Sequence, residues 1–146
     1  MSSNDLIKRG FQKFGIFSLL DFRNKDNKKI FNNTGVYVFV LGEKFNRLIG
    51  ETDILYIGQS GGTKRGKGRP VYNRLIDYCI GSEKAPQDKR VHDSLERLIK
   101  AGKSVILFFK AVEKNNCEKE ESDLLKQFSG KHIELPPLNR SHKIYK

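Results

Sequence analysis

Residues 35–41 read Gly-Val-Tyr-Val-Phe-Val-Leu, and residues 53–58 read Asp-Ile-Leu-Tyr-Ile-Gly. Both stretches are rich in β-branched and aromatic residues, a composition typical of β-strands. Residues 42–52 join them as a predicted loop and are too few for the crossover that parallel strands need. We therefore expect the two strands to pair antiparallel.

Side chains in a strand point alternately to the two faces of the sheet, so the sequence also predicts which residues share a face. Tyr37 should lie on the same face as Gly35, and Tyr56 on the same face as Ile54 and Gly58. If the strands form a hairpin, the two tyrosines could lie close together. For either tyrosine alone, ordinary packing in the core is the simpler interpretation.

The chain before this hairpin carries weaker patterns. Residues 4–20 mix apolar and basic side chains, which indicates a short helix followed by an irregular apolar segment. Residues 23–34 are polar and rich in turn-forming residues, so a loop is expected there. We expect residues 1–34 to be an N-terminal extension that packs on the core of a single domain spanning residues 1–146.

The chain after the hairpin alternates between helical and strand patterns. Pro70 suits the first turn of a helix that runs to about Ile80 and is closed by Gly81. The remaining elements are a helix over about 87–101, an apolar and so central strand at 104–112, a helix at 116–129 and an extended tail at 135–141. The expected fold class is α/β, with a small, mainly antiparallel three-stranded sheet flanked by helices.

The composition restricts what the protein binds and where it works. The net charge of +11 indicates a polyanion partner, with nucleic acid the leading candidate. A ribosome-associated protein or a simply basic soluble protein would carry the same charge. No stretch approaches the roughly 20 apolar residues of a membrane helix, and the two cysteines form no CxxC pair. We expect a soluble cytoplasmic protein that does not act at a membrane.

Residues 59–69 form a glycine-rich loop that contains basic residues and no acidic one. Such a loop is typical of a mobile segment that lies across a nucleic-acid backbone, where its basic side chains would bind the phosphates. The predicted nucleic-acid contacts are Lys64, Arg65, Lys67 and Arg69 in this loop and Arg140 in the tail.

The helix after Pro70 presents a polar pair on its inner side. Val71, Leu75 and Tyr78 mark the buried face, and Arg74 lies four residues before Tyr78. An inward-facing arginine could bind a phosphate through two parallel hydrogen bonds. It could equally lie over the edge of the core and pair with a carboxylate.

A glutamate shares the apolar face of the last predicted helix. Glu121 lies three and four residues before Leu124 and Leu125. A carboxylate in this position is unfavourable unless it is paired or bound to a cation. Glu118, one turn earlier, is the nearest rival for such a role. For Glu121 alone, a solvated carboxylate at the rim of the core, or one paired with a lysine, is the simpler interpretation.

Taken together, these residues resemble the GIY-YIG nuclease family. Gly35-Val36-Tyr37 is similar to its first motif, with Val for Ile, and Tyr56-Ile57-Gly58 matches its second motif letter for letter. Three later segments resemble the family's arginine helix, its glutamate-bearing helix and its closing proline-asparagine element: residues 73–78, 121–126 and 136–139. The five landmarks follow one another in the family's order.

The resemblance implies a metal-dependent endonuclease that hydrolyses phosphodiester bonds in DNA and leaves a 5′-phosphate and a 3′-hydroxyl. It implies one Mg²⁺ or Mn²⁺ per active site, held by Glu121. DNA would be the substrate, with RNA a further candidate, and the chain would act as a monomer or a DNA-induced dimer. The implied catalytic residues are Tyr37, Tyr56, Arg74, Tyr78, Glu121 and Asn139.

Each implied residue has an implied role. Arg74 would stabilise the phosphate in the transition state. Tyr37 would accept a proton from the attacking water, provided that a neighbouring cation lowers its pKa. Tyr56 and Tyr78 would position water and phosphate by hydrogen bonds, and Asn139 would brace the site.

The chain also departs from the family pattern. Many members place a lysine directly after the second motif, where this chain has Gln59, and Lys64 or Lys67 could take its place. The long loop before Arg74 leaves Arg69 as a rival for the catalytic arginine. Two other functions stay open: a non-catalytic DNA- or RNA-binding module on the same fold, and a structural basic protein that docks on ribosomal RNA.

Overall fold

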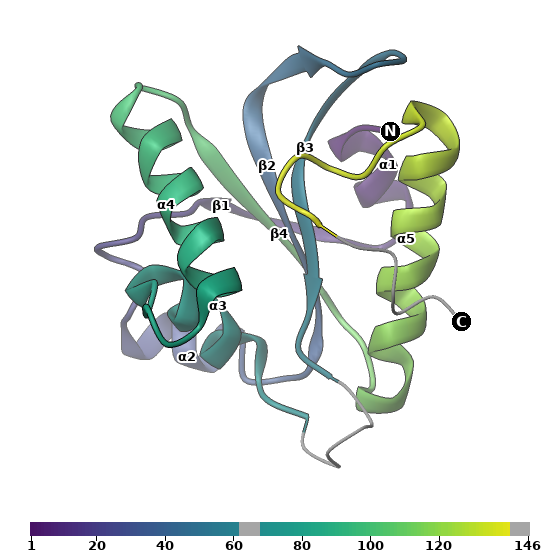
Figure 1. Ribbon diagram of the computed structural model, residues 1–146. Coiled ribbons are helices and arrows are strands. Elements are labelled where there is room, and N and C mark those ends of the chain that lie inside the picture. The colour runs from purple at the N-terminus through teal and green to yellow at the C-terminus, as the bar shows by residue number, and fades with distance from the viewer. Residues whose placement is uncertain (62–67, 141–146) are drawn as a thin grey trace.

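Four strands form one antiparallel sheet in the computed structural model, which describes residues 1–61 and 68–140 (Figure 1). The strands are β1 (Gln12–Ile16), β2 (Gly35–Asn46), β3 (Glu51–Gln59) and β4 (Val105–Ala111). Their order across the sheet is β1-β4-β2-β3, and each neighbouring pair runs antiparallel. The α/β class with a helix-flanked antiparallel sheet is therefore confirmed, and β1 and β3 are the outer strands.

The prediction of three strands is wrong, because β1 lies where the sequence indicates an irregular segment. The register of β1 against β4 shifts between Lys13 and Gly15, so its residues show no simple alternation of buried and exposed side chains. β1 is defined by backbone pairing with a strand far along the chain. Local sequence carries little signal for such a strand.

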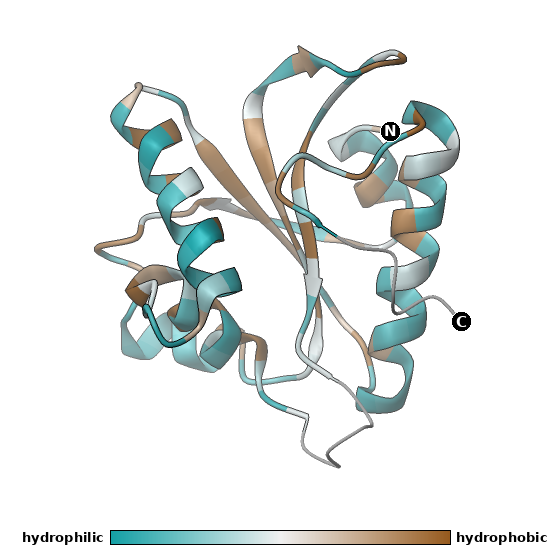
Figure 2. Cartoon of the chain, viewed as in Figure 1, coloured by the Kyte–Doolittle hydropathy of each residue, from teal (hydrophilic) through white to brown (hydrophobic). Residues whose placement is uncertain are grey.

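Helices cover both faces of the sheet, which Figure 1 shows nearly edge-on. One face carries α1 (Ser3–Lys8) and α5 (Cys117–His132), and the other carries α2 (Lys25–Ile30), α3 (Val71–Ile80) and α4 (Pro86–Lys100). Each face has its own apolar core, and Figure 2 shows hydrophobic strands between helices with hydrophilic outer sides. We name these the α5 face and the α3–α4 face.

Two segments predicted as loops contain regular structure. α2 interrupts the predicted loop 23–34, because the Asn24 side chain accepts a hydrogen bond from a backbone amide of the first turn (2.8 Å) and caps the helix. The α2 sequence is almost wholly polar, so no hydrophobic period marks it. The predicted loop 42–52 is shorter than expected, because β2 and β3 remain paired as far as Asn46 and Glu51.

The elements with a clear apolar pattern are confirmed. α3 and α4 begin and end within a residue of the predicted limits, and α3 is closed by Gly81 in the left-handed conformation (φ 62°). β4 lies between β1 and β2, as its apolar sequence predicts. α5 continues past residue 129 to His132. In the described part of the chain, no helix is long and apolar enough to cross a membrane.

A bulge in β3 changes the faces that its residues occupy. Phe39 pairs with Tyr56, but the next residue, Val40, pairs with Ile54, so Leu55 is the extra residue. Leu55 and Tyr56 therefore both contact the α3–α4 core, whereas Ile54 packs in the α5 core. The prediction that Ile54 and Tyr56 share a face is wrong for this reason.

Candidate active site

Three tyrosine side chains form a hydrogen-bonded cluster on the α3–α4 face. The Tyr78 hydroxyl lies 2.6 Å from the Tyr37 hydroxyl and 3.2 Å from the Tyr56 hydroxyl. Tyr37 and Tyr78 are buried, whereas Tyr56 is partly exposed. The β2–β3 hairpin supplies two of these phenols and α3 supplies the third, so the cluster forms only when the helix packs on the sheet.

Gly58 allows the Tyr37 ring to lie directly against β3. The two residues are opposite each other in the β2–β3 register. A Cβ atom at position 58 would lie 2.6 Å from Cε2, Cζ and Oη of Tyr37, which is far closer than an ordinary carbon contact. The glycine therefore fixes where the Tyr37 hydroxyl sits, above the backbone of an outer strand.

The Arg74 guanidinium joins the cluster from α3. It donates a hydrogen bond to the Tyr78 hydroxyl (2.9 Å) and lies 5.1 Å from the centre of the Tyr78 ring. It also forms ion pairs with Asp77 (2.9 Å) and with Asp88 of α4 (3.2 Å). Asp88 carries no sequence signal for this role, because acidic residues are common in the first turn of a helix.

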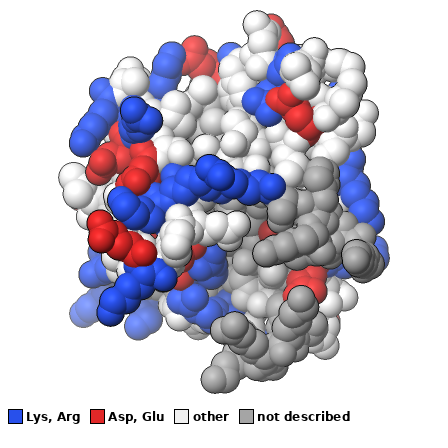
Figure 3. Space-filling view, in the orientation of Figure 1, with Lys and Arg blue, Asp and Glu red and all other residues white. Residues whose placement is uncertain are grey.

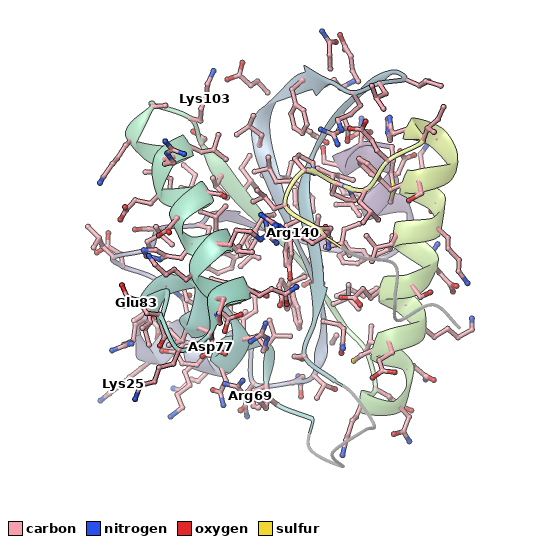
Figure 4. All side chains as sticks on the ribbon, viewed as in Figure 1. Lys25, Arg69, Asp77, Glu83, Lys103 and Arg140 are labelled. Carbon is pink, nitrogen blue, oxygen red and sulfur yellow. The ribbon has the colours of Figure 1, made fainter. Side chains whose placement is uncertain are left out.

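Arg69, the rival for the catalytic arginine, lies outside the cluster. It is exposed and precedes α3, and it pairs with Asp77 of that helix (3.1 Å); Figure 4 labels both residues. Among the residues that the structure describes, no hydrogen bond joins Arg69 to a tyrosine of the cluster. The geometry therefore favours Arg74.

Burial keeps the three phenols neutral. Desolvation raises the pKa of Tyr37, Tyr56 and Tyr78 above the value of 10 that a free phenol has, and Arg74 opposes this shift at each of them without reversing it. The lowered pKa that a base at Tyr37 requires is therefore not found in this arrangement. The phenols act here as neutral hydrogen-bonding groups.

Glu121 lies on α5, on the other face of the sheet. Its side chain is buried at 7 % exposure, beside Leu124 and Leu125. Within residues 1–61 and 68–140, no hydrogen bond or ion pair reaches the Glu121 carboxyl group. Burial, together with the charge of Glu118, raises the pKa of Glu121 to about 8, and Arg74 opposes the shift.

Glu121 is nevertheless electrostatically coupled to the tyrosine cluster. Its charge helps to raise the pKa of Tyr37 and of Tyr56, and the charge of Arg74 acts on Glu121 in turn. Because α5 also packs against β3, the carboxylate and the cluster flank the same outer strand from its two sides.

The tail after α5 is hydrogen-bonded to the outer side of β3. The Asn139 side chain accepts a hydrogen bond from the Ile57 amide (2.9 Å) and donates one to the Ile57 carbonyl (2.8 Å). The Leu138 amide donates to the Leu55 carbonyl (3.0 Å). Asn139 thereby holds the strand that carries Tyr56, and Figure 1 shows the tail crossing in front of β3.

Two oxygen donors of the kind that a hard cation prefers lie on the α5 face. Glu121 supplies carboxylate oxygens, and Gln59 faces the same side of the sheet with a buried Oε1 to which no described residue donates a hydrogen bond. Mg²⁺ takes one or two protein ligands of this kind and completes its shell with water and phosphate oxygens. The described residues contain no cluster of three or more His, Cys, Asp or Glu, so the site differs from a closed metal site.

The predicted nucleic-acid contacts are only partly described. Arg69 and Arg140 are exposed, whereas Lys64, Arg65 and Lys67 lie outside the described residues. Figure 3 shows a band of basic side chains across the middle of one face, and Figure 4 labels Arg140 at the same place. Arg140 lies next to β3, the outer strand that carries Tyr56, because the preceding Asn139 is hydrogen-bonded to Ile57.

Comparison of the chain with models of known protein families, with curated proteins and with solved structures found no match.

Proposed function

We propose that the protein is a metal-dependent endonuclease of the GIY-YIG type, which hydrolyses phosphodiester bonds in DNA. One observation carries the proposal. Residues that are far apart in the sequence and resemble the family's landmarks lie around β3: Tyr37, Tyr56, Arg74 and Tyr78 in one hydrogen-bonded cluster, with Glu121 across the strand and Asn139 on its outer side. The net charge of +11 also suits a phosphate backbone.

In the proposed reaction, a water oxygen attacks the scissile phosphorus and the bond to the 3′ oxygen breaks. The products are a 5′-phosphate and a 3′-hydroxyl. Arg74 would donate hydrogen bonds to the phosphate oxygens as negative charge develops on them. Tyr78 and Asp88 already orient its guanidinium, so little reorganisation would be needed when the substrate arrives.

Glu121 would hold the divalent cation, with Gln59 as a second oxygen donor. The bound ion would supply positive charge that offsets the negative charge on the phosphate and on the leaving 3′ oxygen. Glu121 would have to release the proton that it keeps up to about pH 8. We therefore expect cleavage to need less added metal as the pH rises from 6 to 8.

The roles of the phenols follow from their exposure. Tyr37 is buried and protonated, so it does not act as the base in this arrangement. Tyr56 is the partly exposed phenol, and its hydroxyl can accept a proton from water while donating its own to solvent. Tyr37 and Tyr78 would hold Arg74 in place.

A plasmid-nicking assay tests the proposal. Supercoiled plasmid should be nicked in Mg²⁺ and stay intact in EDTA. Arg74→Ala and Glu121→Gln should each lower the nicking rate by about a hundredfold or more, while the affinity for a labelled duplex, measured in EDTA by fluorescence anisotropy, stays close to that of the wild type.

Asp123→Asn is the matched control for Glu121→Gln. It also removes a carboxylate from α5, but Asp123 is half-exposed and pairs with Lys119 (3.2 Å) and Arg9 (3.7 Å), away from the tyrosine cluster. This variant should keep the nicking rate of the wild type. Nicking that persists in EDTA, or that survives in Glu121→Gln, would refute the metal role of Glu121.

A non-catalytic nucleic-acid-binding module is the second candidate function. The pairing of Arg74 with two aspartates favours it, because a guanidinium so occupied can be purely structural. Such a module would bind the duplex with a marked salt dependence and would give no Mg²⁺-dependent nicking in the same assay.

A further inference from the structure

A second pair of arginines lies beside the tyrosine cluster. Arg90 of α4 donates a hydrogen bond from Nη2 to the Leu138 carbonyl (2.6 Å), so its guanidinium reaches across to the tail. Arg140 follows Asn139, whose hydrogen bonds to Ile57 fix the backbone next to it. Both arginines therefore lie at the outer side of β3.

The two arginines lie at the same part of the tail, because Arg90 is hydrogen-bonded to the carbonyl of Leu138, two residues before Arg140. Burial and then the charge of Arg140 lower the pKa of Arg90, whereas Tyr56 and Tyr78 raise it. Neither arginine forms an ion pair with a carboxylate of the described residues. The Arg90 Nε is buried, and no described residue accepts its hydrogen bond. Arg90 thus keeps a donor that no residue of 1–61 or 68–140 satisfies.

This pair differs from the arginines at the start of α3. Arg69 and Arg74 each have an aspartate partner. Arg90 and Arg140 have like charge, no counter-ion among the described residues and a fixed backbone beneath them. Two such charges held together favour an anion between them, and the planar fork of a guanidinium matches the oxygens of a phosphate.

We propose that Arg90 and Arg140 bind a backbone phosphate of the nucleic acid next to the scissile phosphate. The identity of this ligand rests on the proposed function. Leu138 and Asn139, which precede Arg140, are hydrogen-bonded to Leu55 and Ile57 on either side of Tyr56, so the bound phosphate lies beside the one that Arg74 would hold. The pair sets the path of the strand across β3 and touches no reacting atom.

Binding to a fluorescein-labelled DNA duplex in EDTA, at several salt concentrations, tests this inference. Each phosphate contact contributes about 0.9 to the slope of log affinity against log salt. Arg140→Ala should lower the slope by about one contact, and the double variant Arg90→Ala/Arg140→Ala by about two. Between 50 and 200 mM salt, each lost contact should remove about a threefold change in affinity.

Arg90→Ala and Arg140→Ala differ in the other contacts that they remove. Arg90→Ala also removes the hydrogen bond to the Leu138 carbonyl, so a change in tail packing could contribute to its effect. Arg140→Ala avoids this, because the Arg140 side chain is exposed. Arg90→Lys/Arg140→Lys keeps both charges and should retain most of the slope. Lys28→Ala/Lys126→Ala removes the same charge from exposed sites on α2 and α5 and should leave the slope unchanged.

The outcomes separate this inference from the proposed function. A wild-type protein that binds but does not nick plasmid would refute the endonuclease, while a smaller slope in Arg140→Ala would still support the phosphate site. A wild-type protein that nicks normally, with an Arg140→Ala slope equal to that of the wild type, would overturn the phosphate site alone. Nicking by Arg140→Ala should show a higher KM and an unchanged kcat, because the contact positions the strand only.

Discussion

Replacing Gly58 by alanine tests the geometry on which the tyrosine cluster depends. The new methyl group would lie 2.6 Å from three atoms of the Tyr37 side chain, and an ordinary contact requires about 1 Å more. The Tyr37 ring cannot move freely, because it is 1 % exposed and hydrogen-bonded to Tyr78. Overpacking of this kind costs about 1 to 3 kcal/mol.

Thermal unfolding followed by circular dichroism measures this cost. For a chain of this size, each kcal/mol corresponds to about 2–4 °C in Tm, so Gly58→Ala should lower Tm by about 2–12 °C. Gly130→Ala is the matched control, because nothing lies within 4 Å of the added Cβ in α5. That variant should be stabilised by about 0.5 to 1 kcal/mol through its higher helix propensity.

Repeating the Gly58→Ala substitution in a Tyr37→Leu protein tests whether contact with the Tyr37 ring causes the loss of stability. In Tyr37→Leu, the ring that the new methyl group would meet is absent, so Gly58→Ala should destabilise that background much less. A Gly58→Ala protein that melts within 1 °C of the wild type would refute the reasoning. So would an equal loss of stability in the two backgrounds.

Three further changes test other parts of the site. In EDTA, Glu121 keeps its proton in the folded protein up to about pH 8 and loses it near 4.5 when unfolded, so wild-type stability should fall as pH rises across this window. Glu121→Gln should remove that fall, which amounts to at most about 4 to 5 kcal/mol, and parallel pH profiles from urea unfolding would contradict this. Asp88→Asn weakens the charge-assisted hydrogen bonds to Arg74 and should cost about 1–2 kcal/mol; unchanged urea unfolding would show that the pair contributes nothing. Asn139→Ala should speed hydrogen exchange of the Ile57 amide, measured by NMR. An unaltered exchange rate would show that the hydrogen bond to Asn139 does not protect this amide.

The spacing of apolar residues along each strand or helix predicts most of the fold. The strand at 35–41, the helix after Pro70 and the central strand at 104–112 carry their own signal, because side-chain spacing reports which face is buried. Glu121 could be singled out in the same way, since it shares a face with Leu124. β1 and α2 could not, because backbone pairing and a side-chain cap define them.

The partners of the site residues were less predictable than the residues themselves. Asp88 and Arg90 belong to α4, a helix whose sequence shows only ordinary polar positions outside its apolar face. Their roles depend on how α4 packs against α3 and the tail, and nothing in the local sequence encodes that packing. The direction of the Tyr37 pKa shift likewise depends on burial, which only the assembled core determines.

The hydrogen bonds from the tail to β3 have a consequence for self-association. A free strand at the margin of a sheet offers its amides and carbonyls to a neighbouring molecule, and such pairing leads to aggregation. Here the Leu55 carbonyl and both backbone groups of Ile57 are already satisfied by Leu138 and Asn139. Crowded copies of this chain therefore cannot extend the sheet from molecule to molecule at this position.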